Sequence, residues 1–526
     1  MAVEENCFWE SRVAIIGGGI SGIAAAKQLY RYDPVVFEAS DSIGGVWKHC
    51  SYRSTRLQTP RRDYEFSDYP WPEPHDESFP THIEIVEYLL GYATHFDVLK
   101  FVKFNSKVVE IRFLGSNQFL ELYSRPLTGR PVWEVGVKRK GSDDVQWYPF
   151  EFLVMSIGKY GDIPRLLAFP LDKGPEVFRG KVMHSLDYCK LNPEATERLM
   201  KGKKVVVVGY KKSAIDLAVE CAEANRGPAE QPCTMLIRTL HWTVPSYRMW
   251  GLPFFLFYST RTSQFLHERP NQSFLRDIVS LFSSPLRRAV SRLIESYLVW
   301  KLPLKKYGLV PDHPFEEDYA SCQMAILPEN FFSEADQGRI LFKKSSKKWW
   351  FYDGGIELED NTRLEADVVM LATGFEGKSK LKSILPEPFR DLIENSSGIM
   401  PLYRSTIHPL IPNMAFVGYV ESVSNLHSAE LQCKWLARLL DNHFTLPNVE
   451  RMLKQTTEEM EVMKRTTRFY KRNCISTFSI NHSDEICEEM GWNSWRKSNW
   501  LSEAFSPYSN RDYREDGKGS MVFSIM

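Results

Sequence analysis

Two glycine-rich stretches, about 190 residues apart, have the spacing needed to hold the pyrophosphate of a dinucleotide. The first runs from Gly17 to Gly22 and follows the apolar run 13–16, and the second occupies 209–214 and follows the apolar run 205–208. Glycines in such a turn let the backbone approach the phosphates, which then lie at the positive N-terminus of the next helix. One site of this kind binds one dinucleotide. Two sites on one chain therefore predict two cofactors and electron transfer between them.

The first stretch has all the context that such a site requires. Gly17 permits a tight turn after the strand, Gly19 allows close approach of a pyrophosphate, and Gly22 lets the helix pack on the strand. The next predicted strand, at 34–37, ends in Glu38, 21 residues after Gly17, where a carboxylate can accept hydrogen bonds from a ribose. We assign these residues and Ser21 to the first cofactor site.

A further glycine pair extends this site. The string from Glu38 to Trp47 contains Gly45, Val46 and Trp47, and it resembles the extended FAD signature of flavoproteins with two dinucleotide domains. The resemblance implies FAD at the first site. Taken alone, the glycine pair Gly44–Gly45 is equally compatible with a surface turn.

The second stretch departs from the pattern at its centre. Gly209, Ser213 and Ala214 fit, but Lys211 replaces the middle glycine. A side chain there should obstruct the backbone's approach to a pyrophosphate, unless the ammonium contacts the phosphates itself or the side chain turns outward from a reshaped loop. Arg238 follows the next strand, 29 residues after Gly209, where an arginine in NADP-specific folds pairs with the 2′-phosphate. We predict NADPH at this site; an exposed surface arginine is the alternative for Arg238.

Composition limits the other classes of function. The 66 basic residues balance the 66 acidic residues, so no net field favours nucleic acid. Nine cysteines lack Cys-x-x-Cys spacing, and twelve histidines lack metal-ligand spacing, so we expect free thiols in a reducing compartment and no metal site. The number of subunits is not indicated.

No uncharged run reaches the length of a transmembrane helix. Charged residues interrupt the apolar stretch 274–304, which predicts amphipathic helices under a cap rather than a membrane anchor. The chain begins with an acidic segment instead of a signal peptide. We expect a cytoplasmic protein, with association to an endomembrane surface left open.

The order of predicted elements indicates an α/β fold with two Rossmann-like domains, the second inserted in a discontinuous first. We expect residues 1–175 to form the first part of the FAD domain, 176–330 the NADPH domain with a helical insertion, and 331–526 the rest of the FAD domain with a helical C-terminal region. Additional strands are expected at 101–109, 118–123, 132–137, 367–375 and 413–419.

Three short motifs carry a resemblance to a known family. Phe178 to Tyr188 matches FxGxxxHxxxY, the identifying motif of flavin-containing monooxygenases and related N-hydroxylases. Leu371 to Phe375 is similar to that family's LATGY motif, with Phe in place of Tyr, and implies a cofactor role for Thr373 and Gly374. Phe66 to Pro72 resembles its FSDFPWP segment.

Longer segments resemble one branch of that family. Residues 184–191, 250–258, 318–331 and 425–430 are similar to plant flavin-containing monooxygenases of the immune-signalling branch, the N-hydroxypipecolate synthase type. The resemblance implies FAD, NADPH and O2, with a C4a-hydroperoxyflavin that N-hydroxylates pipecolate, a cyclic secondary amine, in systemic plant immunity. Exclusion of water and orientation of the substrate are then the protein's contributions.

The resemblance also implies two residues near the reacting flavin. Gln58 stands where most members place an asparagine facing the flavin peroxide, and Asn425 follows a run expected to meet the isoalloxazine. Asn425 or Ser424 is equally well placed to cap a helix. His184 is expected to orient the hinge between domains. The alternatives are S-oxygenation of thioethers, aryl-pyruvate decarboxylation of the auxin type, or a flavin-binding redox sensor, which only Lys211 supports.

Overall fold

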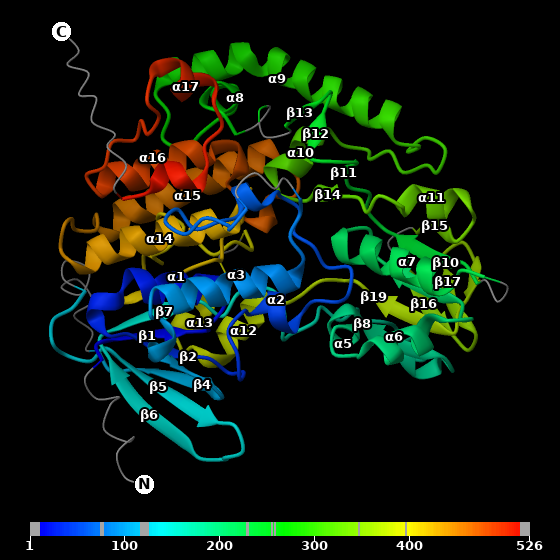
Figure 1. Cartoon of the computed structure of the whole chain (residues 1–526), viewed down its shortest axis with the longest axis horizontal. Helices are drawn as coiled ribbons and strands as arrows, with labels where there is room; N and C mark the ends of the chain where they lie inside the picture. Colours follow the sequence, from blue (N-terminus) through cyan, green and yellow to red (C-terminus); the bar gives the residue numbers. More distant parts are fainter. Residues whose placement is uncertain are drawn as a thin grey trace.

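The computed structural model describes residues 11–73, 78–115, 126–227, 231–253, 256, 259–345, 348–394 and 397–515. Two parallel sheets, each flanked by helices, lie side by side beneath a layer of long helices (Figure 1). The predicted α/β fold with two Rossmann-like units is confirmed.

The first sheet is built from apolar runs that are buried on both faces, as parallel strands between helices must be. Its strand order is β20-β7-β1-β2-β3, and every pairing is parallel. The strands are β1 (Val13–Ile16), β2 (Val35–Phe37), β3 (Val102–Lys103), β7 (Phe152–Met155) and β20 (Met414–Phe416). Because β20 comes from far along the chain, this unit is discontinuous.

The second sheet has the order β15-β10-β9-β19-β8 and is also entirely parallel. Its strands are β8 (Lys181–His184), β9 (Val205–Val208), β10 (Cys233–Ile237), β15 (Ile340–Lys344) and β19 (Val368–Leu371). The boundary expected at residue 330 is therefore wrong, because two strands beyond it pair with this second sheet. Thr373 and Gly374 accordingly follow a strand of the second unit.

Small antiparallel sheets decorate both units. The first unit carries β4 (Ser106–Phe113), β5 (Trp133–Arg139) and β6 (Val145–Phe150), and the second carries β16 (Trp349–Tyr352), β17 (Gly355–Leu358) and β18 (Arg363–Glu365). The strand expected at 118–123 lies outside the described residues. There are also two short pairs: β11 (Thr243–Val244) with β14 (Ala325–Ile326), which is parallel, and β12 (Arg248–Met249) with β13 (Leu252–Pro253), which is antiparallel.

Helices cover both sheets and form the upper layer of Figure 1. Around the first sheet lie α1 (Ile20–Gln28), α2 (Val46–His49), α3 (His82–His95), α12 (Gly377–Ile384), α13 (Phe389–Leu392) and α14 (Asn425–Leu440). Around the second lie α5 (Ser185–Tyr188), α6 (Pro193–Met200), α7 (Lys212–Ala224) and α11 (Phe331–Asp336). The upper layer contains α8 (Arg261–Phe265), α9 (Phe274–Lys301), α10 (Phe315–Ala320), α15 (Val449–Thr466), α16 (Ser479–Glu489) and α17 (Trp500–Phe505).

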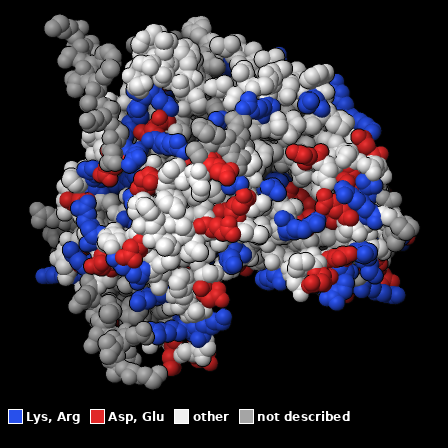
Figure 2. All heavy atoms as spheres, viewed as in Figure 1, with Lys and Arg blue, Asp and Glu red and all other residues white. Residues whose placement is uncertain are grey.

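Helix α9 differs from its prediction. Most of the stretch 274–304 forms one 28-residue helix, Phe274–Lys301, on the outside of the molecule, and Phe274, Phe282 and Trp300 are each at least 75% exposed. The upper rim of Figure 2, where α9 lies in Figure 1, is mostly uncharged, with basic side chains toward its right. The expectation that these helices would lie under a cap is therefore wrong. None of the helices within the described ranges is both long and apolar enough to cross a membrane.

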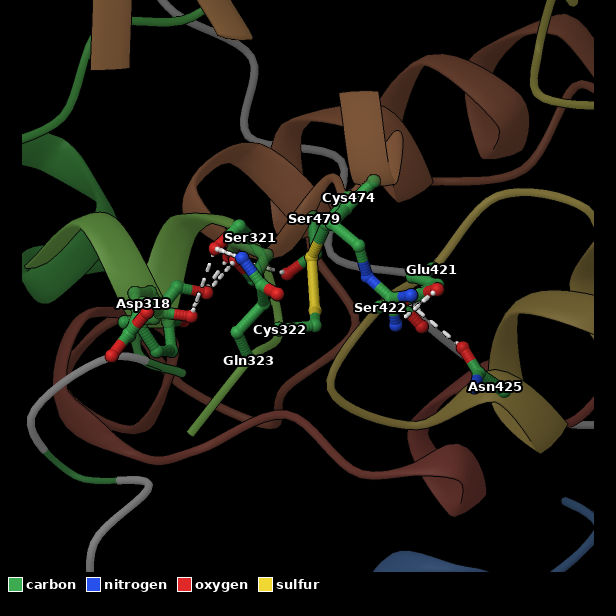
Figure 3. Close-up of a disulfide and its surroundings, with 12 residues drawn as sticks. Asp318, Ser321, Cys322, Gln323, Glu421, Ser422, Asn425, Cys474 and Ser479 are labelled. Atoms are coloured by element: carbon green, nitrogen blue, oxygen red, sulfur yellow. Dashed lines mark hydrogen bonds and ion pairs between the residues drawn. A yellow bond between two sulfur atoms is a disulfide. The ribbon is translucent and has the colours of Figure 1, made fainter. Parts of the chain in front are cut away.

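One disulfide corrects the prediction of free thiols. Cys322 and Cys474 are bonded, although 152 residues separate them in the sequence. The bond joins the segment after α10 to the segment before α16, so it links the insertion of the second unit to the C-terminal region (Figure 3). The spacing of the cysteines could not reveal this pair, because only the tertiary fold brings them together.

Candidate functional site

The turn after β1 has the geometry of a pyrophosphate cradle. Gly17 adopts φ +105°, and a Cβ on Gly22 would lie 1.8 Å from the carbonyl oxygen of Gly17, so α1 packs against the strand only without a side chain there. A Cβ on Gly19, by contrast, would meet nothing closer than Gly45 Cα at 3.7 Å. The space in front of Gly19 is therefore open to a ligand, at the unpaired N–H groups of the helix N-terminus.

Glu38 lies at the carboxyl end of β2, as predicted. Its carboxylate is buried and accepts hydrogen bonds from Gly18 N at 2.6 Å and from Ser40 N at 2.8 Å. These bonds fix the carboxylate beside the cradle, where its remaining lone pairs can meet a ribose. The first site thus has the turn, the helix and the acid that FAD requires.

The glycine pair Gly44–Gly45 forms another side of the first cofactor site. Gly45 adopts φ +53° and comes within contact of Gly19, and Val46 and Trp47 begin α2 directly after it. The indole nitrogen of Trp47 donates to Tyr64 Oη at 3.2 Å. On the far side of the turn, a Cβ on Gly418 would lie 2.4 Å from Ser21 Oγ, so the segment after β20 packs closely on α1 there.

In the second turn, Lys211 has an exposed side chain, which is compatible with the alternative that it turns outward. Its backbone has φ −109°, which any residue adopts, so no glycine is needed there for conformation. Its ammonium donates to Gln323 Oε1, in the segment beside the disulfide. Crowding by the surrounding protein and the charge of Arg472 lower the pKa of Lys211 to about 8. The side chain therefore reaches the insertion of its own unit.

The other predicted residues of the second cofactor site lie at or directly after the turn that follows β9, or at the end of β10. Gly209 adopts φ +140°, and its Cβ would lie 2.9 Å from Ala372 O. Ala214 is buried against the sheet, while Ser213 borders the cleft at the start of α7. Arg238 is exposed directly after β10, at the same edge of the sheet.

A cavity of about 470 Å³ lies between the two turns. Four predicted residues line it: Trp47, Gln58, Ser213 and Asn425. The side-chain oxygen of Gln58 accepts a hydrogen bond from Ile326 N at 2.9 Å, which ties the first unit to β14 of the second. Because that bond uses the carbonyl, the amide NH2 is the group that Gln58 can offer to a ligand.

A buried ion cluster forms one wall of this cavity. Glu421, 4% exposed, contacts Lys159 at 2.7 Å and Arg472 at 2.8 Å, and Tyr160 donates to it as well. Burial alone would raise the pKa of Glu421, but the two cations hold it below its usual value. The cluster holds the segment that carries Cys474 against the segment that leads to Asn425 (Figure 3).

Ser424 and Asn425 form the N-terminus of α14, directly after the segment that carries Glu421. Ser424 is the N-cap and accepts a bond from His427 N at 3.4 Å, while Asn425 Oδ1 accepts one from Ser422 N at 3.0 Å. Both side chains thus act in the turn, in line with the capping alternative, and a catalytic role for Asn425 stays a prediction. A second cavity of about 600 Å³ adjoins the first at Ser422 and Val423.

Residues of the two identifying motifs, 178–188 and 371–375, form hydrogen bonds that stabilise the fold. His184 Nδ1 accepts a bond from Leu186 N at 3.1 Å, and Tyr188 Oη donates to Glu220 at 2.6 Å. Thr373 Oγ1 donates to Arg165 O at 2.6 Å, and Gly374 O accepts from Arg165 N at 2.8 Å. The contacts of Thr373 and Gly374 join the second unit to the segment at Arg165, whereas those of His184 and Tyr188 lie within the second unit. A direct cofactor contact of Thr373 or Gly374 stays a prediction.

The fold also gathers groups that the sequence did not connect. Asp318, fully buried, contacts His241 at 2.7 Å and His313 at 3.1 Å and accepts a bond from Trp242 N at 2.6 Å. Because both carboxylate oxygens are shared among these donors, we interpret the group as a fastening between α10 and the 241–242 segment. Asp216 on α7, with Lys212 at 2.5 Å, likewise lines the cleft. No motif signals the Asp318 group, since the 241–242 segment is far in the sequence from His313 and Asp318.

The comparisons with known proteins agree with this architecture. The family described as "FMO-like: Flavin-binding monooxygenase-like" matches residues 10–495. The chain is 62% identical over 520 residues, 98% of either chain, to a probable flavin-containing monooxygenase 1 of Arabidopsis thaliana. Its fold is similar to that of OTEMO in complex with FAD and NADP (TM-score 0.64, 20% identity, 88% of this chain and 92% of that one). It is also similar to S-allyl-L-cysteine S-oxygenase from Allium sativum (TM-score 0.56, 20% identity, 91% and 88%). Together with the two nucleotide turns and the cavity between them, these matches show that the chain belongs to the flavin-binding monooxygenase family.

Proposed function

We propose that this enzyme uses NADPH and O2 to hydroxylate the ring nitrogen of L-pipecolate, as part of systemic immunity in a plant. The observation that carries the proposal is the cavity of about 600 Å³ beside the start of α14. Serines and charged side chains line much of it, including Arg62, Asp63 and Ser428, so it suits a small polar molecule that carries a carboxylate. The choice of pipecolate as the substrate comes from the resemblance of several segments to the immune-signalling branch of plant flavin-containing monooxygenases.

The chain's own residues have separable tasks in this reaction. The turn at Gly17–Gly22 and Glu38 would hold FAD, and the turn at Gly209 with Arg238 would hold NADPH. When bound, the two cofactors supply the reducing equivalents and the activation of O2. Gln58 would offer its amide NH2 toward the reacting edge of the flavin, and the surrounding walls would exclude water.

The substrate must react as the neutral amine, because the oxygen is added to the nitrogen lone pair. Burial disfavours the ammonium form of an amine. Two histidines in this region show that the surroundings disfavour a positive charge. Burial lowers the pKa of His427 to about 4 and that of His482 to about 3. A site that disfavours cations selects the minor deprotonated form of the substrate.

The deciding experiment is a turnover assay with ¹⁸O2. L-pipecolate, a methylthioalkyl amino acid and indole-3-pyruvate are supplied separately with NADPH, and the products are resolved by mass spectrometry. We expect one ¹⁸O atom on the ring nitrogen of pipecolate. Hydrogen peroxide alone with pipecolate, but a labelled sulfoxide from the thioether, would replace this proposal with S-oxygenation. Flavin that NADPH fails to bleach would favour a redox sensor.

We also propose that the enzyme works in the cytoplasm with α9 resting on an anionic membrane surface. The exposed apolar residues of α9 include Leu281 and Phe282, and exposed Arg288 and Arg292 lie on the same helix. Apolar side chains beside basic ones are typical of helices that lie in the plane of a membrane. Sedimentation with phosphatidylserine vesicles should fall at least fivefold in Leu281→Ser/Phe282→Ser; equal sedimentation would contradict the membrane contact.

A further inference from the structure

The cavity of about 600 Å³ has a wall that none of the predicted site residues forms. The C-terminal segment 507–513 closes one side, and α14 with the segment 475–483 closes the other. Arg511 anchors the C-terminal segment by contacting the buried Glu65 at 2.5 and 3.2 Å. His427, the third residue of α14, lines this cavity beside that wall.

Two contacts hold His427 in place. Its backbone N–H donates to the N-cap Ser424, and its ring lies 4.6 Å from the ring of Tyr513. Within the described ranges, no side chain or backbone group is recorded as a hydrogen-bond partner of its ring nitrogens. Because burial keeps the imidazole neutral at pH 7, one ring nitrogen is an acceptor and is available to a ligand.

The chemistry of a neutral secondary amine matches such an acceptor. Its nitrogen carries one N–H and one lone pair, and the lone pair receives the oxygen. An acceptor that holds the N–H fixes the rotation of the nitrogen and so directs the lone pair away from itself, toward the adjoining cavity. A tertiary amine or a thioether has no such hydrogen and gains nothing from the same acceptor.

We propose that His427 orients the substrate by accepting a hydrogen bond from the N–H of a cyclic secondary amine, and thereby selects secondary amines over tertiary amines. This inference rests on the proposed function, because it deepens the same site. It assigns a substrate-orienting residue to the cavity between α14 and the C-terminal segment.

The chain offers a matched control. His482 on α16 is buried, whereas His427 is only partly so. Burial likewise lowers the pKa of His482, but it is not among the residues that line this cavity. The variants are therefore His427→Phe, which keeps the ring shape without an acceptor, His427→Gln, which restores an acceptor, and His482→Gln. Bound FAD, measured by its absorbance, checks that each variant is folded.

The substrates are L-pipecolate and N-methyl-L-pipecolate, which differ only in the N–H. For His427→Phe we expect kcat/KM with pipecolate to fall about tenfold, the worth of one hydrogen bond, and that with the N-methyl compound to change less than twofold. His427→Gln should recover most of the loss, and His482→Gln should resemble the unaltered enzyme. Equal losses with both substrates, or no loss with pipecolate, would overturn the inference.

A binding measurement separates this inference from the proposed function. Equilibrium dialysis of labelled pipecolate against the oxidised holoenzyme needs no turnover. Binding that weakens about tenfold in His427→Phe would support the site even if the enzyme released only hydrogen peroxide, in which case the proposed function alone would fail. Unchanged binding, or no binding to the unaltered enzyme, would overturn the site itself.

Discussion

Two glycines in one turn have different physical tasks, and substitution by alanine should separate them. A Cβ on Gly22 collides with the backbone of Gly17, whereas a Cβ on Gly19 fits the protein and intrudes only on the space for a cofactor. Gly22→Ala should therefore lower thermal stability and yield little folded protein. Gly19→Ala should fold normally, as judged by circular dichroism, but retain less than about a tenth of the FAD. Full FAD content in Gly19→Ala would contradict the cradle.

Arg238 should decide between the two nicotinamide coenzymes. Only NADPH carries the 2′-phosphate, and a charge-assisted hydrogen bond to it is worth about 1.5–3 kcal/mol. Arg238→Ala should therefore reduce the preference for NADPH over NADH roughly ten- to a hundredfold, measured as the ratio of flavin reduction rates. If both coenzymes suffer equally, Arg238 serves only the structure.

Arg62 is our prediction for the substrate carboxylate. It lines the cavity of about 600 Å³, and a guanidinium is a suitable partner for a carboxylate. Arg62→Gln should raise the KM for pipecolate at least tenfold and leave that for piperidine, which has no carboxylate, nearly unchanged. A parallel rise for both substrates would show a general disturbance of the cavity.

The sequence identifies site residues where the chemistry is local. Glu38 and Gly17 belong to one continuous strand–turn–helix–strand unit, so spacing alone places them. Glu421 and Arg472 share an ion cluster only because β20 and the segment before α16 meet in space. No local sequence pattern reveals a contact between segments so far apart. For the same reason, the sequence could not place His427 beside the C-terminal segment 507–513.

At the scale of elements, the packing of α15 against α16 should make stability depend on pH. Burial, and then the charge of Glu485, raise the pKa of Glu459 on α15 to about 8, against about 4.5 in the unfolded chain. Between these values the unfolded state binds fewer protons, so the free energy of unfolding falls as pH rises. Glu459→Gln removes the titrating group and therefore this loss of stability at high pH.

We therefore expect Glu459→Gln to stabilise the protein by about 2 kcal/mol at pH 8 and by much less at pH 5, measured by chemical denaturation at both values. Glu458→Gln is the matched control, since it makes the same change of side chain at a partly buried position on the same helix. A constant difference between Glu459→Gln and the unaltered protein across this range would mean that Glu459 titrates normally.

Element types were predictable where apolar runs are short and bounded, as at β1, β9 and β19. Which sheet each strand joins was not predictable, because β19 is as apolar as the strands of the first sheet and β15 is a short run that ends in two lysines. Only their pairing assigns them to the second sheet. Helix α9 was misread for a related reason. Periodicity shows that a helix has an apolar face, but it does not show whether protein covers that face.

At the scale of the whole molecule, the Cys322–Cys474 disulfide should tie the insertion to the C-terminal region. It closes a loop with a sequence separation of 152 residues, for which the chain-entropy argument gives about 3–5 kcal/mol of stabilisation. Cys322→Ser/Cys474→Ser should therefore melt at a lower temperature than the oxidised protein. Dithiothreitol should lower the melting temperature of the unaltered protein but not that of the variant. A reductant-independent melting temperature in the unaltered protein would exclude this role.

The pairing of β20 with β7 has a consequence for the order of assembly. During synthesis, β7 emerges early and remains at the edge of the first sheet, with one row of backbone groups unpaired, until β20 follows the whole second sheet out of the ribosome. The second sheet can therefore be completed while the first still lacks its last strand. A chain released before residue 416 would contain a finished NADPH-type unit joined to an unfinished FAD-type unit whose open edge invites aggregation.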